Sequence, residues 1–283
     1  MLKMKKQLIL FLVLINVQIF AQQYENFGEM FGVDNAIMGQ NIIRGEVGFS
    51  MSQMWYQPPA KPLIDYTRYT SVVGLDVNPY EHFHIRAQFY FDLEKKEEKP
   101  PYLSNVYYQI GWYDWRDRTI SFGYENYGTN RFESPVTDFA TSLKRGFVFA
   151  SFNYDLLGDR AGLKFDDDSQ IRITPFVRYS LEYPDSLGVE KGGNHKVVLG
   201  TSARWSIIKK IYVEGAVYYY PDKASKLPWD PDFTYGLGYF NWEAFKLNIS
   251  YGNWIANRFP WNDKEMEHTP FDGELKVMFT WSL

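Results

Sequence analysis

Two histidines two residues apart, His82 and His84, lie in a stretch where polar and apolar residues alternate. Alternate residues of an extended strand point to opposite faces, so both imidazoles would share the polar face. A His-x-His pair binds a transition metal when further ligands are close. The remaining histidines, His195 and His268, fall in predicted loops, and no third ligand can be placed beside the pair. We therefore expect these imidazoles to hydrogen-bond carboxylates, and we predict no metal and no other cofactor.

Charged residues recur on the same polar face along the rest of the chain, and basic ones outnumber acidic ones. The basic residues that alternation places there are Arg44, Arg68, Arg86, Arg172, Arg178, Lys196, Arg204, Lys246 and Lys276. The acidic ones are Glu46, Asp76, Asp92, Glu125, Glu182 and Glu214. Basic residues arranged around a pore would select anions. The other interpretation, that ion pairs fill a closed interior, stays open, because long side chains can plug a barrel of moderate width.

Two predicted loops share the tripeptide Asn-Arg-Phe and are candidate sites outside the strands. Their candidate residues are Asn130 and Arg131 in the first loop, and Trp254, Arg258, Phe259 and Trp261 in the second. Exposed aromatic clusters mark ligand or partner sites. A loop that folds over the mouth of a barrel as a lid would have the same composition, so both interpretations remain.

The elements that must position these residues are strands. Alternation recurs from residue 42 to the last residue in segments of roughly ten, and the pattern predicts about twelve strands. Short connections (78–80, 114–117, 207–210 and 241–243) alternate with long ones (57–66, 94–102, 128–144, 184–195, 221–232 and 252–273), with 155–170 as an irregular link. This regularity predicts an antiparallel up-and-down sheet with every long loop at one end and both termini at the other.

The apolar face of this sheet could form a water-shielded core or could face lipid. Mixed-sign charges among tyrosines and glycines on the polar face favour a packed, hydrogen-bonded interior. Tyrosines and tryptophans near the strand ends are typical of a membrane–water interface. An open sheet edge in lipid would leave backbone groups unsatisfied. We therefore predict that residues 42–283 form a closed transmembrane β-barrel with its polar face inside.

The N-terminus has the pattern of a secretory signal peptide. Three lysines precede an apolar run from Leu8 to Phe20, and Ala21 is a small residue at the predicted cleavage site. The run is shorter than the ~20 residues of a spanning helix. We predict that residues 1–21 are removed and that residues 22–41 lie in the periplasm or the lumen. Loss of the three lysines takes the formal net charge from −4 to −7, which disfavours nucleic-acid binding.

With the strands, the signal sequence and the apolar terminal segment GELKVMFTWSL in place, the chain resembles Gram-negative outer-membrane β-barrels of about twelve strands. The resemblance covers residues 42–283 and implies contact with outer-membrane lipid and periplasmic termini. The function that it implies is a narrow channel or transport component for small solutes, with anionic solutes as one version. A plugged structural barrel that binds a membrane-protein partner is the alternative, and a lipid-modifying enzyme is the second alternative. The sequence does not define the oligomeric state.

Outer-membrane phospholipase A, one twelve-stranded member of this class, gives a test of the enzyme alternative. Its lead-in Gly-Tyr matches Gly123 and Tyr124, but its catalytic histidine falls near Asn126 and its serine near Gly128. Neither residue can act as base or nucleophile. The chain has no Gly-rich phosphate loop, zinc motif or nucleophile elbow either, so we predict no catalytic residues.

Overall fold

One antiparallel sheet dominates the computed structural model of the chain. The structure describes residues 42–56, 64–80, 82–94, 104–114, 116–126, 139–157, 170–185, 191–208, 210–240, 246–254, 257–259 and 273–282. The predicted segments 1–21 and 22–41 lie outside these ranges.

The strands are β1 (Ile42–Tyr56), β2 (Ile64–Tyr80), β3 (Phe83–Asp92), β4 (Val106–Trp112), β5 (Ile120–Asn126), β6 (Phe147–Phe152), β7 (Tyr154–Leu157), β8 (Gln170–Pro184), β9 (Lys191–Ile208), β10 (Ile211–Tyr219), β11 (Phe233–Tyr239), β12 (Leu247–Asn253) and β13 (Glu274–Ser282). Within the described ranges, two short helices accompany them, α2 (Phe139–Arg145) and the 3-10 helix η1 (Lys223–Ser225). Among the described residues, no helix is long and apolar enough to cross a membrane.

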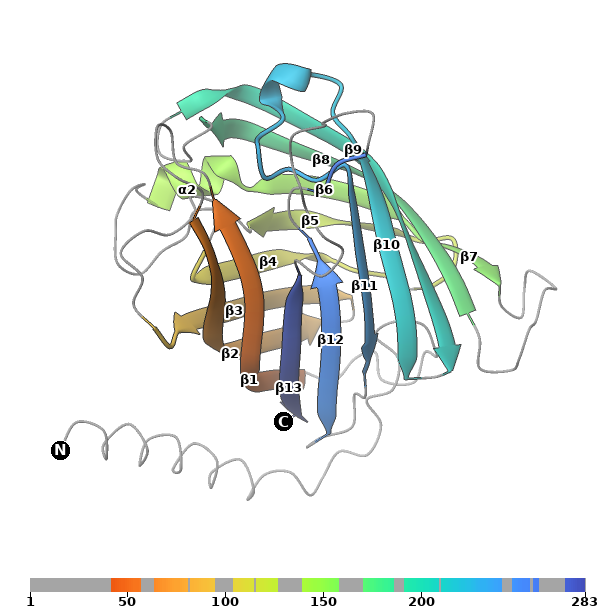
Figure 1. Ribbon diagram of the computed structural model, residues 1–283. Helices are drawn as coiled ribbons and strands as arrows, with labels where there is room; N and C mark the ends of the chain where they lie inside the picture. The colour runs from red at the N-terminus through yellow and green to blue at the C-terminus, as the bar shows by residue number, and fades with distance from the viewer. Residues whose placement is uncertain are drawn as a thin grey trace.

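The sheet closes on itself as a barrel. Strands that are neighbours in chain order pair with each other, except that β6 and β7 both pair with β8, and β1 pairs with β13. β6 and β7 are two parts of one wall strand, because both pair with β8 and only Asn153 separates them. The barrel wall therefore has twelve strands, and the predicted fold is confirmed (Figure 1). Closure removes sheet edges, which have no hydrogen-bonding partner in lipid.

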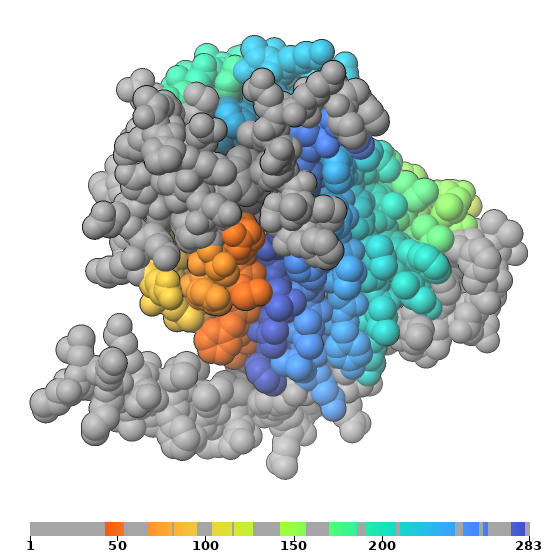
Figure 2. All heavy atoms as spheres, viewed as in Figure 1, coloured from red at the N-terminus to blue at the C-terminus, as the bar shows by residue number. Residues whose placement is uncertain are grey.

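The side chains of this barrel are arranged inside out relative to a water-soluble protein. Arg44 and Lys196 point inward and are 3% and 2% exposed, whereas Phe49 and Tyr219 point outward and are 59% and 63% exposed. The outer surfaces of β1, β13, β12, β11 and β10 adjoin as a continuous wall (Figure 2). Apolar side chains outside and charged side chains inside suit a wall that faces hydrocarbon.

The connections divide the barrel into two ends. β2 and β3 are joined by 81–82, β4 and β5 by 113–119, and β9 and β10 by 209–210. This short-turn end also holds the C-terminus, while η1 stands at the opposite, long-loop end (Figure 1). Residues 220–232, which include η1, connect β10 to β11 there. The alternation of short and long connections therefore fits the predicted up-and-down order.

Replacing the outward-facing Phe49 by arginine tests the lipid contact. Near the middle of a bilayer, arginine on the lipid face of a barrel costs about 2–4 kcal/mol. We expect Phe49→Arg to lower the free energy of unfolding in lipid vesicles by that amount, measured by urea titration, while Phe49→Leu stays near the wild type. Equal stability of the arginine variant would mean that this face meets water.

Candidate functional site: the barrel lumen

Two cavities lie inside the barrel wall. The first, here called the charged cavity, has a volume of about 350 Å³ and is lined in part by Glu46, Arg86, Arg204, Glu214 and Lys276. The second, here called the hydroxyl cavity, has a volume of about 290 Å³ and is lined in part by Ser151, Asn153, Thr174, Ser202 and Trp254. Arg204 and Glu214 line both cavities. The two cavities therefore meet at this pair.

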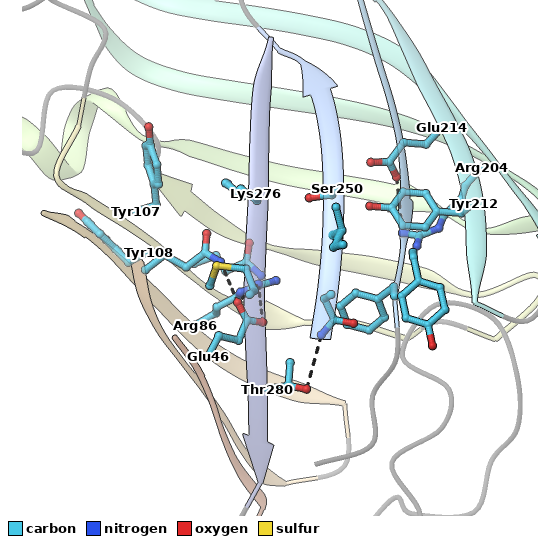
Figure 3. Close-up of a pocket in the computed structure, with 17 residues that line it drawn as sticks. Glu46, Arg86, Tyr107, Tyr108, Arg204, Tyr212, Glu214, Ser250, Lys276 and Thr280 are labelled. Carbon is cyan, nitrogen blue, oxygen red and sulfur yellow. Dashed lines mark hydrogen bonds and ion pairs between the residues drawn. The ribbon is translucent and has the colours of Figure 1, made fainter. Parts of the chain in front are cut away.

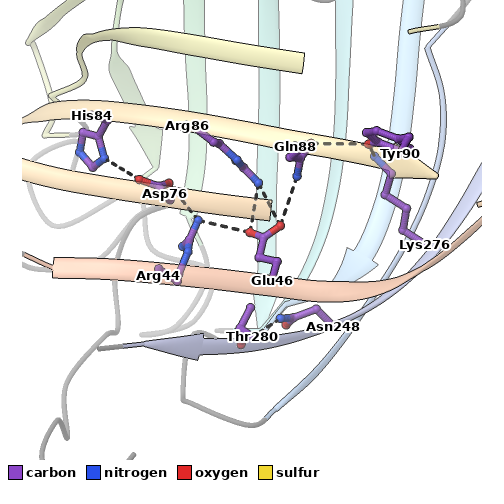
Figure 4. A network of polar contacts seen from close by, with 10 residues as sticks. All are labelled: Arg44, Glu46, Asp76, His84, Arg86, Gln88, Tyr90, Asn248, Lys276 and Thr280. Carbon is purple, nitrogen blue, oxygen red and sulfur yellow. Dashed lines mark hydrogen bonds and ion pairs between the residues drawn. The ribbon is translucent and has the colours of Figure 1, made fainter. Parts of the chain in front are cut away.

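A network of buried charges occupies the wall formed by β1, β2 and β3 (Figure 4). The Arg44 guanidinium lies 3.4 Å from Glu46 and 3.1 Å from Asp76. Arg86 donates to the same Glu46 carboxylate at 3.1 Å, and Gln88 donates to it at 3.2 Å. These residues are cross-strand neighbours, because Arg44 is in register with Asp76 and Asp76 with Arg86. The Glu46 carboxylate therefore joins β1 to β3, and the contact between Arg44 and Asp76 adds β2 to the network.

The two histidines contact carboxylates near the short-turn end. His84 Nδ1 lies 3.4 Å from Asp76, and His82 Nε2 lies 3.6 Å from Asp114. The His84 ring also meets the Tyr113 ring edge to face, with centroids 5.8 Å apart. Within the described part of the chain, no group of three His, Asp or Glu side chains is placed to hold a metal ion. The geometry fits imidazoles that pack as part of the wall.

Further ion pairs line the rest of the interior. Each joins a predicted inward base to an acid: Arg68 to Asp92 at 2.6 Å, Arg172 to Asp155 at 2.7 Å, Arg178 to Glu125 at 2.6 Å and Lys276 to Glu274 at 3.1 Å. The Lys276 ammonium also donates to the Tyr90 hydroxyl at 2.6 Å. The lumen thus holds charge mainly as neighbouring pairs of opposite sign.

The Arg204–Glu214 pair, which lines both cavities, has a longer contact than the ion pairs just described. Arg204 and Glu214 are 3.5 Å apart, and the Arg204 guanidinium carbon lies 3.7 Å from the centroid of the Tyr212 ring. A cation over an aromatic face is attracted by the ring quadrupole. Stacking therefore fixes the guanidinium on one side of the lumen, with Glu46 and Arg86 on the other (Figure 3).

The segment 220–232, here called the lid, connects β10 to β11 at the long-loop end of the barrel (Figure 1). Lys196, which points inward from β9, forms an ion pair with Asp230 of this segment. Arg258 donates to the carbonyl oxygens of Pro228 at 2.7 Å and Leu227 at 3.3 Å, and also to that of Asp230. Phe259 N donates to Asp232 at 3.0 Å. The lid is therefore fastened both to the barrel wall and to the segment that follows β12.

Tyr220 adds a hydrogen bond within the lid. Its hydroxyl donates to the Pro231 carbonyl at 3.1 Å. Burial first, and then the carboxylate of Asp230, raise the pKa of the Tyr220 phenol above its usual value. The phenol therefore keeps its proton and remains a donor to the lid.

The remaining predicted site residues fall in several places. Glu182 lies 3.5 Å from Lys144 and from Lys191 at the long-loop rim. Lys246 precedes β12 and is exposed, and it is not part of the described lining of either cavity. Asn130, Arg131 and Trp261 lie outside the described residues. Asn126, at the position of the phospholipase histidine, donates to the Ser142 carbonyl at 2.8 Å and helps to anchor α2.

Sequence reasoning missed two parts of this site. Ser250 lines the charged cavity, and Asp230 anchors the lid. Alternation places Ser250 on the inner face, but a single uncharged residue does not by itself indicate a cavity. Asp230 belongs to a predicted loop, and no local pattern links a loop carboxylate to an inward lysine more than thirty residues earlier.

The fold and the polar lumen together define a transmembrane β-barrel of the outer-membrane class. No protein-family model and no curated protein matches the chain. Among solved structures, it is similar to an outer-membrane channel from Pseudomonas putida F1 (TM-score 0.42, 9% identity, 92% of this chain and 100% of that chain). It is also similar to the NanC porin (TM-score 0.40, 10% identity, 85% and 98%) and to Omp33 of Acinetobacter baumannii (TM-score 0.34, 9% identity, 88% and 100%). These likenesses are too distant to assign an activity.

Proposed function

We propose that the protein is an outer-membrane channel through which small polar solutes diffuse, with a preference for anions. The observation that carries this proposal is a pair of cavities that meet inside a closed barrel wall. A packed core would fill that space with side chains. The lumen instead leaves room for solutes beside charged and hydrogen-bonding groups.

The anion preference rests on two ion pairs in which the basic partner is the more accessible one. The Arg86 side chain is 26% exposed and its partner Glu46 is 9% exposed. Likewise, Arg178 is 30% exposed and Glu125 is 7% exposed. At these two pairs a solute in the lumen therefore meets the guanidinium group before the carboxylate, and basic linings favour anions.

Neutralising the accessible arginines tests this preference. We expect Arg86→Gln and Arg178→Gln to move the ratio of anion to cation permeability toward one, because each removes an accessible positive charge. The measurement is the reversal potential of the protein in a planar bilayer under a salt gradient. Arg118→Gln is the matched control, because Arg118 is exposed in the 113–119 turn. Unchanged selectivity in both lumen variants would remove the anion preference from the proposal.

The topology is part of the same proposal. The ends of β1 and β13 share the short-turn end of the barrel, and outer-membrane barrels of bacteria have short periplasmic turns and longer external loops. We propose that both termini face the periplasm, that the lid faces outward, and that residues 1–21 direct export.

A second candidate function is a closed barrel that binds a membrane-protein partner. The lid favours it, because the ion pair of Asp230 with Lys196 and the contacts of Arg258 fasten that segment at the long-loop end. Discrete current steps from the purified protein in a planar bilayer would support the channel. A silent bilayer, together with co-purification of one stable membrane protein, would support the closed barrel.

A further inference from the structure

Trp254 forms an aromatic platform on the inner wall of the hydroxyl cavity. Gly236 of β11 and Gly252 of β12 are register partners on the inner face. A Cβ atom on Gly252 would lie 2.1 Å from the Trp254 ring, and one on Gly236 would lie 2.8 Å from it. The indole therefore rests directly on the backbone of two paired glycines, in space that any larger residue would occupy. Its side chain is exposed and lines the cavity.

Most of the residues that line the wall around this platform carry an uncharged hydrogen-bonding group. Hydroxyl groups come from Ser151, Thr174, Ser202, Ser206 and Thr234, and amides come from Asn153 and Gln170. Hydroxyls both donate and accept hydrogen bonds, and amides offer one acceptor and two donors. A solute with many hydroxyl groups can therefore exchange its bonds to water for bonds to this wall.

The charged groups at this wall are already paired. Arg172 donates to Asp155 at 2.7 Å, and Arg204 lies 3.5 Å from Glu214. A solute ion would have to compete with these charged partners. An uncharged polar solute would compete only with hydrogen bonds between neutral groups, such as the one that the Thr174 hydroxyl donates to Asn153 at 3.2 Å. The hydroxyl cavity thus differs in chemistry from the charged cavity beside it.

We propose that the hydroxyl cavity is a binding site for an uncharged carbohydrate, which stacks on Trp254 while it passes through the channel. The C–H-bearing face of a sugar ring carries partial positive charge and matches the negative face of an indole. The hydroxyls at the rim of the sugar would meet the hydroxyl and amide side chains. A cavity of about 290 Å³ lies near the lower limit of ligand sites and suits a single sugar ring. This inference rests on the proposed channel function and names a solute class for it.

The test is block of the ion current by maltose, used as the probe in a planar bilayer. We expect maltose to reduce the wild-type current in a saturable manner, because the bound sugar occupies the path. Trp254→Leu should raise the half-blocking concentration about tenfold, because it removes the stacking face. Trp254→Tyr keeps an aromatic face, so its half-blocking concentration should stay close to that of the wild type. Trp205→Leu, on the exposed outer face of β9, is the matched control and should behave as the wild type.

The outcomes separate this inference from the proposed function. A wild-type protein that carries no ion current overturns both. A protein that conducts ions, but whose current falls linearly with maltose as bulk conductivity falls, overturns the carbohydrate site and leaves the channel. Equal half-blocking concentrations in Trp254→Leu and in the wild type overturn it as well. The ion current of each variant without maltose shows that the variant has folded.

Discussion

Replacing Asp230 by asparagine is expected to increase the conductance of the reconstituted barrel. The ammonium group of Lys196 is almost completely buried and forms an ion pair with Asp230. Removing one partner of a buried pair leaves an uncompensated charge at a cost of roughly 3–5 kcal/mol. Movement of the lid away from Lys196 would relieve that cost by admitting water, and the same movement would widen the long-loop end. The measurement is the single-channel conductance in a planar bilayer.

Two controls make this prediction specific to the ion pair. The double variant Lys196→Met with Asp230→Asn carries no unpaired charge and should return the conductance toward that of the wild type. Lys223→Gln changes an exposed charge in the same segment and should have no effect. Wild-type conductance in Asp230→Asn, with the barrel folded, would contradict the role of this pair in holding the lid.

Replacing Glu46 by glutamine is expected to destabilise the barrel by about 3 kcal/mol. Its carboxylate accepts hydrogen bonds from Arg44, Arg86 and Gln88, which belong to two different strands. Glutamine has a single acceptor oxygen and no charge, so the two guanidinium groups lose part of their compensation. Because Arg86 is partly exposed, we expect the loss of stability to lie near the lower end of the range for buried pairs. Urea unfolding in lipid vesicles measures the change.

Gln88→Met is the matched comparison for this network. It removes one neutral donor from the same carboxylate and leaves both ion pairs in place, so we expect a loss of about 1 kcal/mol. If Glu46→Gln costs no more than Gln88→Met, the charged network does not contribute to the stability of the wall.

The sequence predicts the barrel well because the side-chain period of a strand is two residues. His84 and Arg86 point inward while Ile85 points outward and is exposed, as the alternation in this stretch requires. The interruption of one wall strand at Asn153, between β6 and β7, has no such pattern in the sequence. It depends on the 113–119 turn, where Asn153 N donates to the Thr119 carbonyl and its side chain donates to the Asp114 carbonyl.

The cavities and the lid could not be predicted because they depend on distances across the lumen. Alternation gives Lys196 and Lys246 the same inward direction, yet Lys196 is buried beneath the lid and Lys246 lies exposed before β12 begins. Trp254 was expected to mark either a ligand site or a lid with its own core. Its position on Gly236 and Gly252 follows from the register of β11 and β12, which the sequence alone does not fix.

The most direct test of the channel uses single cysteines, because the chain contains none of its own. Ser250→Cys places a thiol in the charged cavity, and Leu237→Cys places one on the exposed outer face. We predict that a bulky, water-soluble thiol reagent reduces the single-channel current of Ser250→Cys and leaves that of Leu237→Cys unchanged. An absence of current steps in the unmodified protein, or an equal response of the two variants, would contradict a solute path through the lumen.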